Sequence, residues 1–449
     1  MTRIALAFWG LLVLLGGLWV LADPGALAAA GIFPLRAGMV QATGVLAMGC
    51  FSAAMVLALR PGWPERPLGG LDKMYRLHKW FGIGGLVLAV LHWLWVEAPK
   101  WAVGLGWLER PQRGARGTAA GPVEQALGSL RGAAEGLGEW AFYAAVALIV
   151  LALVRWVPYR LFRRTHRWLA AAYLVLVFHT LVLTRFGYWS SPLGLVQGLL
   201  LAAGTWAAVV ALLGRIGIRR RVPGRIVDLR YYPEIRVLEG RVAVSDAWPG
   251  HRAGQFAFVT SDRAEGAHPY TIASAWDPAD PHLTFIAKEL GDHTGRLRER
   301  LVAGQPVTVE GPYGCFTFDD GRPRQIWVGA GIGITPFIAR MKQRAAMAAD
   351  DPERARPVDL FHPTADHSAA AIARLTADAA AAGVRLHVLV DARDGRLNGD
   401  RIRTAVPDWR EAGIWFCGPA GFGRALRADF ARNGLPVRTR FHQELFDLR

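Results

Sequence analysis

The chain has 449 residues, more than a single average domain holds, and 52% of them are hydrophobic, with 18 tryptophans. The apolar stretches crowd into the first half, which predicts a membrane half followed by a soluble half. The net charge of +16 does not indicate nucleic acid, because the basic residues fall mainly beside apolar stretches, where anionic lipid headgroups would meet them. The three cysteines form no CxxC or CxxCH setting. This excludes a disulfide framework, a four-cysteine iron–sulfur site and c-type haem attachment.

Six stretches are long and apolar enough to cross a hydrocarbon core of about 30 Å. Arginines and lysines follow the second, fourth and sixth stretches, so the positive-inside rule places these links and both termini in the cytoplasm. The first stretch also resembles a cleaved secretory signal, although its apolar run is long for one. The predicted spans cover residues 4–22, 37–59, 77–96, 140–156, 168–184 and 192–213.

The rest of the chain divides by pattern into a loop and two soluble domains. Residues 99–139 are rich in Gly and Ala, and we expect them to be weakly structured and to face outward. After Arg221, short β-type runs between Gly and Pro turns predict an antiparallel barrel. From Gln325 onward, strands alternate with Ala-rich helical segments, as in a parallel α/β nucleotide-binding domain. The predicted domains are 1–217 (membrane), 218–321 (barrel) and 322–449 (α/β).

Two apolar stretches carry matched histidines, His78 and His92 on the third and His166 and His179 on the fifth. Spacings of 14 and 13 residues correspond to about 21 and 19.5 Å along a helix, so each helix offers an inner and an outer ligand. Interfacial positions explain His78 or His166 singly but not the whole set, because ionisable residues within membranes are costly and usually functional. The pattern predicts two b-type haems, one between His78 and His166 and one between His92 and His179.

The 13-residue spacing on the fifth stretch does not suit a regular α-helix. An ideal helix brings residues 14 apart to within about 40° of one face, but leaves residues 13 apart about 140° from it. We therefore expect the fifth helix to tilt, twist or carry a bulge.

Two motifs of the barrel suit a flavin nucleotide. Tyr270 and Thr271 stand together at a strand start, where the ring can stack on the isoalloxazine and the hydroxyl or backbone can bind its redox-active edge. About 20 residues later, Gly291 permits close backbone approach and Thr294 opens a short helix, which suits a pyrophosphate. Either motif alone is ordinary, but their order predicts FAD. The expected FAD residues are His268, Pro269, Tyr270, Thr271, Gly291 and Thr294.

A glycine-rich turn, GAGIGITP, follows the strand at 326–328 and precedes a helical segment. Its glycines let main-chain amides and the helix N-terminus approach a dinucleotide phosphate. A second loop around Cys417 follows the last parallel strand and would flank the nicotinamide, although a plain buried thiol is the alternative. The expected nucleotide-binding residues are Gly329, Gly331, Gly333, Thr335, Pro336, Gly418 and Pro419.

The choice between NADPH and NADH depends on the strand at 358–361. Asp359 lies inside it, whereas an acidic residue at its end would favour NAD. His362, Thr364 or Arg393 could receive a 2′-phosphate, which favours NADPH, although both nucleotides stay open.

Together these motifs resemble the NADPH oxidase and ferric reductase superfamily in its short bacterial form, from about Arg36 to Arg449. The resemblance implies a membrane all-α six-helix haem bundle followed by a ferredoxin-reductase-like module with FAD and NAD(P) domains. It places Cys417 near the site of hydride transfer. It also implies that the Phe446 ring shields the flavin and has to move aside before nicotinamide can stack there. The residues expected to act in catalysis are Thr271, Cys417 and Phe446.

The resemblance also implies a function and a location. Electrons would pass from cytoplasmic NAD(P)H through FAD and two haems b to an acceptor outside a bacterial inner (plasma) membrane. Ferric chelates, molecular oxygen and cupric ions stay open as acceptors. One alternative is a component that reduces a quinone or an extracytoplasmic partner protein. Another makes the helices a mere anchor, without haem, for a soluble reductase.

Overall fold

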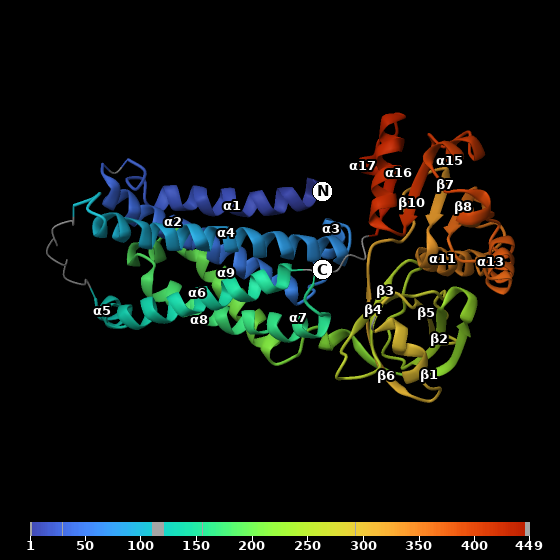
Figure 1. Ribbon diagram of the computed structural model, residues 1–449, viewed down its shortest axis with the longest axis horizontal. Helices are drawn as coiled ribbons and strands as arrows, with labels where there is room; N and C mark the ends of the chain where they lie inside the picture. The colour runs from blue at the N-terminus through green and yellow to red at the C-terminus, as the bar shows by residue number, and fades with distance from the viewer. Residues whose placement is uncertain (1, 29, 110–120, 155, 292, 445–449) are drawn as a thin grey trace. The chain divides into compact units, whose positions relative to one another are not determined.

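The computed structural model describes residues 2–28, 30–109, 121–154, 156–291 and 293–444. The chain forms two compact units, divided after Ile216, with the short segment Gly69–Asp72 grouped with the second. The first unit is helical, and the second combines β-sheets with helices (Figure 1).

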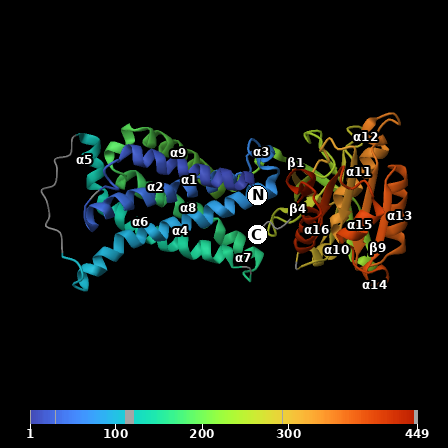
Figure 2. The ribbon, with the colours of Figure 1, turned by 90° about the horizontal axis from the view of Figure 1, so that it is seen from above.

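Among the described residues of the first unit, six helices are long and apolar enough to cross a membrane, as predicted. Within this unit α1 lies beside α2, α9 beside α2, and α6 beside α8 (Figures 1 and 2). Small residues allow close approach, since a Cβ on Gly204 would lie 2.0 Å from the Tyr173 hydroxyl. The helices are α1 (Thr2–Ala22), α2 (Ile32–Ala58), α3 (Glu65–Leu68), α4 (Leu71–Gly104), α5 (Pro122–Ser129), α6 (Arg131–Leu153), α7 (Tyr159–His166), α8 (Trp168–Leu183), η1 (Phe186–Ser190) and α9 (Pro192–Leu212).

The expectation of a weakly structured loop over residues 99–139 is wrong for its described part. Helix α4 continues to Gly104, α5 follows from Pro122, and α6 begins at Arg131. Alanine is the strongest helix former, and Pro122 occupies the first turn of α5, where its missing N–H costs nothing. Residues 110–120 of this loop lie outside the described part of the chain.

The expected irregularity in the fifth span is confirmed. Helix α7 ends at His166 and α8 begins at Trp168, with Arg167 between them. The amide of Ala170 donates to the carbonyl oxygen of Arg167 at 3.2 Å, a bond across three residues that tightens the turn. Because this break lies between His166 and His179, the two histidines need not follow the phase of one regular helix.

The second unit begins with a six-stranded antiparallel sheet in the order β4-β3-β6-β1-β2-β5. Alternating side chains such as Val242, Leu283 and Val309 fill its interior, because neighbouring strand residues point to opposite faces. The strands are β1 (Arg221–Tyr232), β2 (Val237–Val244), β3 (Phe256–Thr260), β4 (His268–Thr271), β5 (His282–Lys288) and β6 (Pro306–Tyr313); short helices are η2 (Ile218–Arg220), η3 (Pro233–Ile235), η4 (Thr294–Arg296) and α10 (Leu297–Arg300).

A five-stranded parallel sheet follows in the order β11-β10-β7-β8-β9. Ile326 and Val328 pack on one face with α15 and α16, while Trp327 between them packs on the other face against Phe337 of α11. Helices therefore cover both faces, as a parallel sheet requires. The elements are β7 (Arg324–Gly329), η5 (Gly331–Ile334), α11 (Thr335–Ala345), α12 (Pro352–Ala355), β8 (Val358–Thr364), α13 (Ala369–Ala381), β9 (Arg385–Val390), α14 (Asp391–Asp394), α15 (Gly399–Ala405), β10 (Ala412–Cys417), α16 (Ala420–Arg432), α17 (Val437–Arg440) and β11 (Phe441–Gln443).

Candidate functional site

Four histidines meet in two pairs inside the helical unit. The ring centroids of His78 and His166 lie 5.9 Å apart, and those of His92 and His179 lie 6.2 Å apart. Two rings that bind one metal ion on opposite sides have centroids about 6 Å apart, from metal–nitrogen bonds of about 2 Å and ring radii of about 1.1 Å. The structure thus brings together the pairs that the sequence predicts, and each gap has room for one iron.

Hydrogen bonds fix the ring orientation of three of these histidines. In each, Nδ1 contacts a backbone carbonyl oxygen, which can only accept, so Nδ1 carries the proton. The other nitrogen, Nε2, keeps its lone pair for a metal. The three bonds join His78 to Ala54 at 2.8 Å, His92 to Val40 at 2.9 Å, and His179 to Ala134 at 2.8 Å.

His166 is held differently. Its Nδ1 is buried and has no hydrogen-bond partner among the described residues. The ring instead stacks on Phe162, one helical turn earlier in α7, with centroids 5.0 Å apart and an interplanar angle of 29°. Packing therefore orients the ligand at the break between α7 and α8.

Glycines make room for the outer pair. A Cβ on Gly138 of α6 would lie 2.0 Å from Nδ1 of His179, closer than any side-chain contact allows. A Cβ on Gly44 of α2 would lie 3.3 Å from the ring of His92. The position of the His179 ring thus depends on the absence of a side chain at Gly138.

Polar contacts join segments of the helical unit that are distant in sequence. The Tyr188 hydroxyl donates to Asp23 at 2.6 Å, and Asp23 also pairs with Arg185. Burial, together with this hydrogen bond, raises the pKa of Tyr188 to about 12. Arg36 donates to the carbonyl oxygens of Trp95 and Val96 at 3.0 and 3.1 Å. These contacts give Tyr188, Arg185 and Arg36 structural partners.

The two motifs expected to hold FAD lie side by side in the barrel. The Tyr270 hydroxyl and His293 Nε2 are 2.9 Å apart, and the rings of His268 and His293 stack with centroids 3.4 Å apart. Burial raises the pKa of the Tyr270 hydroxyl, so it stays a neutral hydrogen-bonding group. Thr271 is buried on β4 opposite Phe256.

The short turn after β5 is closed by its own threonine. The amides of Leu290 and Gly291 donate to the Thr294 hydroxyl at 2.9 and 3.3 Å, so this hydroxyl shapes the turn. Sequence reasoning did not select His293 or Glu265, which pairs with Arg300 at 2.6 Å. Ligand atoms of Glu265, His268 and His293 lie within 4.8 Å of one another. In the sequence, the only signal for Glu265 and His293 is their position before and after the HPYT run.

The glycine-rich turn lies against the loop that contains Cys417. The Ala330 amide donates to the Cys417 carbonyl oxygen at 3.0 Å, and a Cβ on Gly333 would lie 2.2 Å from that oxygen. Pro336 occupies the first turn of α11, where a free N–H is not needed. Close approach of the two loops, each at the carboxyl end of a parallel strand, forms the edge where such sheets bind nucleotides.

Cys417 is buried, and burial followed by the nearby Glu444 carboxylate raises the pKa of its thiol well above the usual value. The group is therefore a neutral thiol at neutral pH. Glu444 is itself 4% exposed and was not selected from the sequence as a site residue. The predicted gate Phe446 lies outside the described residues.

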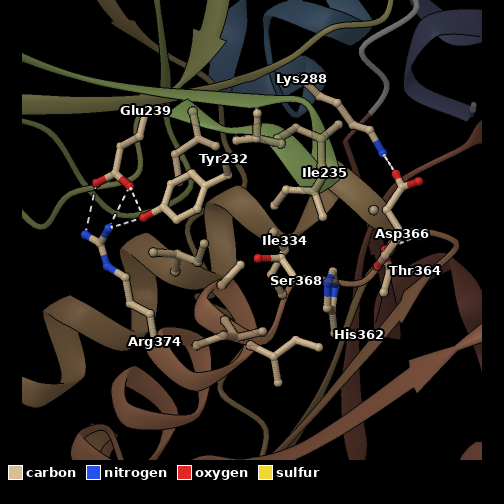
Figure 3. Close-up of a pocket in the computed structure, with 18 of the residues that line it drawn as sticks. Tyr232, Ile235, Glu239, Lys288, Ile334, His362, Thr364, Asp366, Ser368 and Arg374 are labelled. Atoms are coloured by element: carbon tan, nitrogen blue, oxygen red, sulfur yellow. Dashed lines mark hydrogen bonds and ion pairs between the residues drawn. The ribbon is translucent and has the colours of Figure 1, made fainter. Parts of the chain in front are cut away.

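A cavity of about 130 Å³ extends from the glycine-rich turn to the barrel. Figure 3 shows Lys288 of β5 reaching Asp366, and Arg374 reaching Glu239 and Tyr232. The cavity is lined by Tyr232, Ile235, Val237, Glu239, Ile286, Lys288, Gly331, Ile332, Ile334, Ile338, Lys342, His362, Thr364, Asp366, Ser368, Ala371, Ile372, Arg374, Leu375 and Asp378.

The residues weighed for nucleotide choice have distinct roles. Asp359 is buried and bonds Arg324 at 2.8 Å and His387 at 3.0 Å, so it belongs to a structural ion cluster. Arg393 pairs with its neighbour Asp394 at 2.9 Å on the surface. His362 lines the cavity, as does Thr364.

The family models match both units. The description "Ferric reductase like transmembrane component" applies to residues 43–177, and "FAD-binding domain" applies to residues 225–317. The first range includes all of α4 and the four histidine positions except His179. The second includes the HPYT run and the turn with Thr294.

Relatives cover the chain in part. An NADPH oxidoreductase of Mycobacterium tuberculosis is 30% identical over 242 residues, covering 51% of this chain and 60% of the relative. Respiratory burst oxidase homolog protein A of Solanum tuberosum is 27% identical over 240 residues, covering 46% of this chain and 23% of the relative. The chain thus spans less than two thirds of each. The structure of the Amycolatopsis cytochrome P450 reductase GcoB has a TM-score of 0.43 and 24% identity, covering 51% and 70% of the two chains.

The two matched components follow each other along the chain in the same order as the two units. The ferric-reductase-like match begins within α2 and ends within α8, in the unit whose described residues include six helices able to span a membrane, and the barrel that follows contains the FAD-binding match. The chain is therefore an integral membrane protein with a ferric-reductase-like transmembrane component followed by an FAD-binding domain, which supports its resemblance to the NADPH oxidase and ferric reductase superfamily.

Proposed function

We propose that this protein is an oxidoreductase that moves electrons from NAD(P)H through FAD and two b-type haems to an acceptor on the opposite face of the membrane. The observation that carries the proposal is the pair of iron-sized gaps between His78 and His166 and between His92 and His179. A flavin and nucleotide module in the same chain supplies the source of electrons.

The residues present fit the proposed cofactors. The four histidines would hold two irons, and the Nδ1 bonds of three of them keep Nε2 available as the ligand. When bound, FAD accepts a hydride and the haems carry single electrons, so the flavin couples two-electron to one-electron chemistry. Tyr270 and Thr271 would contact the flavin ring, and Gly333 lets the nucleotide turn approach Cys417.

The distribution of charge supports an inward-facing module. Arginines and lysines follow the second, fourth and sixth spans, which favours the cytoplasm for these links and for the module after them. The bacterial inner membrane is proposed from the resemblance to the short bacterial form of the superfamily, and the charge distribution supports only the orientation of the spans. Lipid headgroups would meet these cations.

The acceptor is proposed from the family descriptions. Ferric chelates agree with the ferric-reductase-like component, and molecular oxygen agrees with the name of the potato respiratory burst oxidase. The name of the M. tuberculosis relative includes NADPH, which applies to that protein. The alternative is a component that passes electrons to a quinone or to an extracytoplasmic protein, and it predicts slow turnover until that acceptor is added.

An anaerobic absorbance spectrum of the purified, detergent-solubilised protein tests the proposal. NADH or NADPH is expected to bleach the flavin and then to produce the bands of reduced b-type haem. Ferric citrate or air, admitted afterwards, should reverse these bands and so identify the acceptor. Protein that lacks haem would contradict the proposal and leave a membrane-anchored flavin reductase.

The Gly138→Ala variant is expected to lose the outer haem. The new Cβ would displace the His179 ring. Disturbing the groups that orient a metal ligand typically lowers metal affinity by about 10–100-fold, and we expect a loss of roughly that size for the outer haem. Haem extracted per FAD from the purified protein measures the loss.

Gly136→Ala on the same helix is the matched control. A Cβ there has nothing within 4 Å, and alanine is intrinsically better than glycine in a helix. Its haem content should equal that of the wild type. Equal haem content in both variants would show that His179 does not need the space at Gly138.

A further inference from the structure

The barrel and the α/β domain of the second unit meet around a hollow. Side chains from both domains form its apolar walls, among them Val237 and Ile286 of the barrel and Ile338 and Leu375 of the α/β domain. Interlocking side chains hold most protein interiors in place, but a cavity of about 130 Å³ leaves the middle of this interface without such contacts. The position of the α/β domain on the barrel therefore depends on the groups around the cavity.

Polar contacts join the two domains on opposite sides of this cavity, as Figure 3 shows. On one side, Arg374 of α13 reaches Glu239 of β2 and the hydroxyl of Tyr232 at the end of β1. On the other side, Lys288 of β5 forms an ion pair with Asp366. Each contact connects a barrel strand with the segment from the end of β8 through α13.

The Arg374 contact has the more restrictive geometry. Two guanidinium nitrogens donate to the two carboxylate oxygens of Glu239 at 2.7 and 2.9 Å, and one of them also donates to the Tyr232 hydroxyl at 2.9 Å. Such a forked contact fixes both distance and angle. The Glu239 side chain is only 17% exposed, so water and salt screen the pair less than they screen a pair on the open surface.

Packing connects Arg374 to the glycine-rich turn. Its neighbour Leu375 lies in one hydrophobic cluster with Phe337 and Met341 of α11. Helix α11 begins at Thr335, directly after the turn, and α13 lies beside α11. A shift of α13 on the barrel would therefore carry α11 and the turn with it.

The bonds of Arg374 serve the interface between the domains rather than the α/β domain itself. Within the part of the chain that the structure describes, its guanidinium forms hydrogen bonds with Tyr232 and Glu239, both of which belong to the barrel. Arginine and glutamate meet here across 135 positions of the sequence. Loss of this contact should leave α13 intact and change its position.

We propose that Arg374 is a positioning residue, which holds the α/β domain on the barrel through Glu239 and so sets how the glycine-rich turn faces the flavin motif. The inference rests on the proposed function, because this spacing matters when a nicotinamide nucleotide reduces the flavin. Arg374 acts through the domain interface and touches neither the flavin nor the nucleotide.

Anaerobic stopped-flow absorbance of the flavin in the full-length protein, with saturating NADH or NADPH, tests the proposal. Arg374→Gln should lower the limiting rate by about tenfold or more, since a misplacement of about 1 Å can cost roughly 100-fold. The Kd for adenosine 5′-diphosphate, measured by calorimetric titration, should stay within about twofold of the wild-type value, because a positioning role affects the reaction and not ground-state binding. FAD content should be that of the wild type.

Glu239→Gln provides a second, nearly isosteric variant and should lower the limiting rate to the same extent. Because the two side chains act as one contact, the double variant should match either single variant within about twofold. Effects that multiply in the double variant would overturn the proposal. So would a wild-type limiting rate in Arg374→Gln, or a loss of affinity for adenosine 5′-diphosphate as large as the loss of rate.

Arg241→Gln is the matched control. Arg241 also lies on β2 and pairs with a carboxylate, that of Asp280 at 2.5 Å, but this partner belongs to the barrel as well. Its limiting rate should equal that of the wild type. An equal loss of rate in Arg241→Gln would show that any ion pair on this strand has the same effect and would overturn the proposal.

Hydrogen exchange separates this proposal from the proposed function, because it requires no electron transfer. Mass spectrometry of the full-length, detergent-solubilised protein should show amide exchange in residues 369–381 faster by about threefold or more in Arg374→Gln than in the wild type. If this holds while neither nucleotide reduces the flavin, the proposed function fails and the role of Arg374 in holding the domains stands. Unchanged exchange overturns the role of Arg374 alone.

Discussion

Replacement of His92 with leucine is expected to remove the outer haem and to stop electron transfer to the outer acceptor. Loss of contacts that merely support a metal ligand costs about 10–100-fold in affinity, so loss of the ligand itself should exceed about 100-fold. The haem extracted per FAD should fall from two to one, and the ferric citrate or oxygen rate should fall with it. His179→Leu should give the same result, because its ring faces His92 at 6.2 Å.

Two readouts make this result specific. Reduction of a soluble dye that accepts electrons directly from the flavin should stay at the wild-type rate, which shows that the module is folded. His367→Leu, an exposed histidine outside the spans, should keep both haems. Unchanged haem content in His92→Leu would mean that the helices are an anchor and would contradict the proposed conduit.

Replacement of Gly333 with alanine is expected to slow reduction of the flavin by about 100-fold. The new Cβ would lie 2.2 Å from the Cys417 carbonyl oxygen, so the glycine-rich turn and the Cys417 loop would move apart. A misplacement of about 1 Å at a reacting centre can cost roughly 100-fold in rate. Anaerobic stopped-flow absorbance of the flavin with saturating NADH or NADPH measures this step.

Gly295→Ala provides the control for this change. Gly295 lies in η4 of the barrel, and a Cβ there would meet nothing within 4 Å. Flavin content and haem content should be normal in both variants, which separates loss of hydride transfer from loss of a cofactor. Wild-type flavin reduction in Gly333→Ala would show that the nucleotide does not need this close approach.

Local patterns explain why much of the architecture could be predicted. Hydropathy located all six spans, because a helix in lipid needs about 20 apolar residues whatever surrounds it. Spacing alone paired His78 with His166 and His92 with His179. It also predicted that the fifth helix is irregular, and in the structure α7 and α8 are separated at Arg167. Composition failed over the described part of residues 99–139, where a content of Gly and Ala predicted a loop although alanine favours helix.

Residues close together in the chain are enough to locate the spans, the four histidines, the two motifs expected to bind flavin and the glycine-rich turn. The groups that surround these residues come from distant segments and depend on the three-dimensional fold. Val40 offers His92 a backbone carbonyl, a group that every residue has, so helix packing rather than residue type selects it. Lys288 meets Asp366 across 78 positions because a barrel strand and a parallel strand end at the same cavity. Contacts between elements depend on how whole helices and sheets pack, and no local pattern encodes that packing.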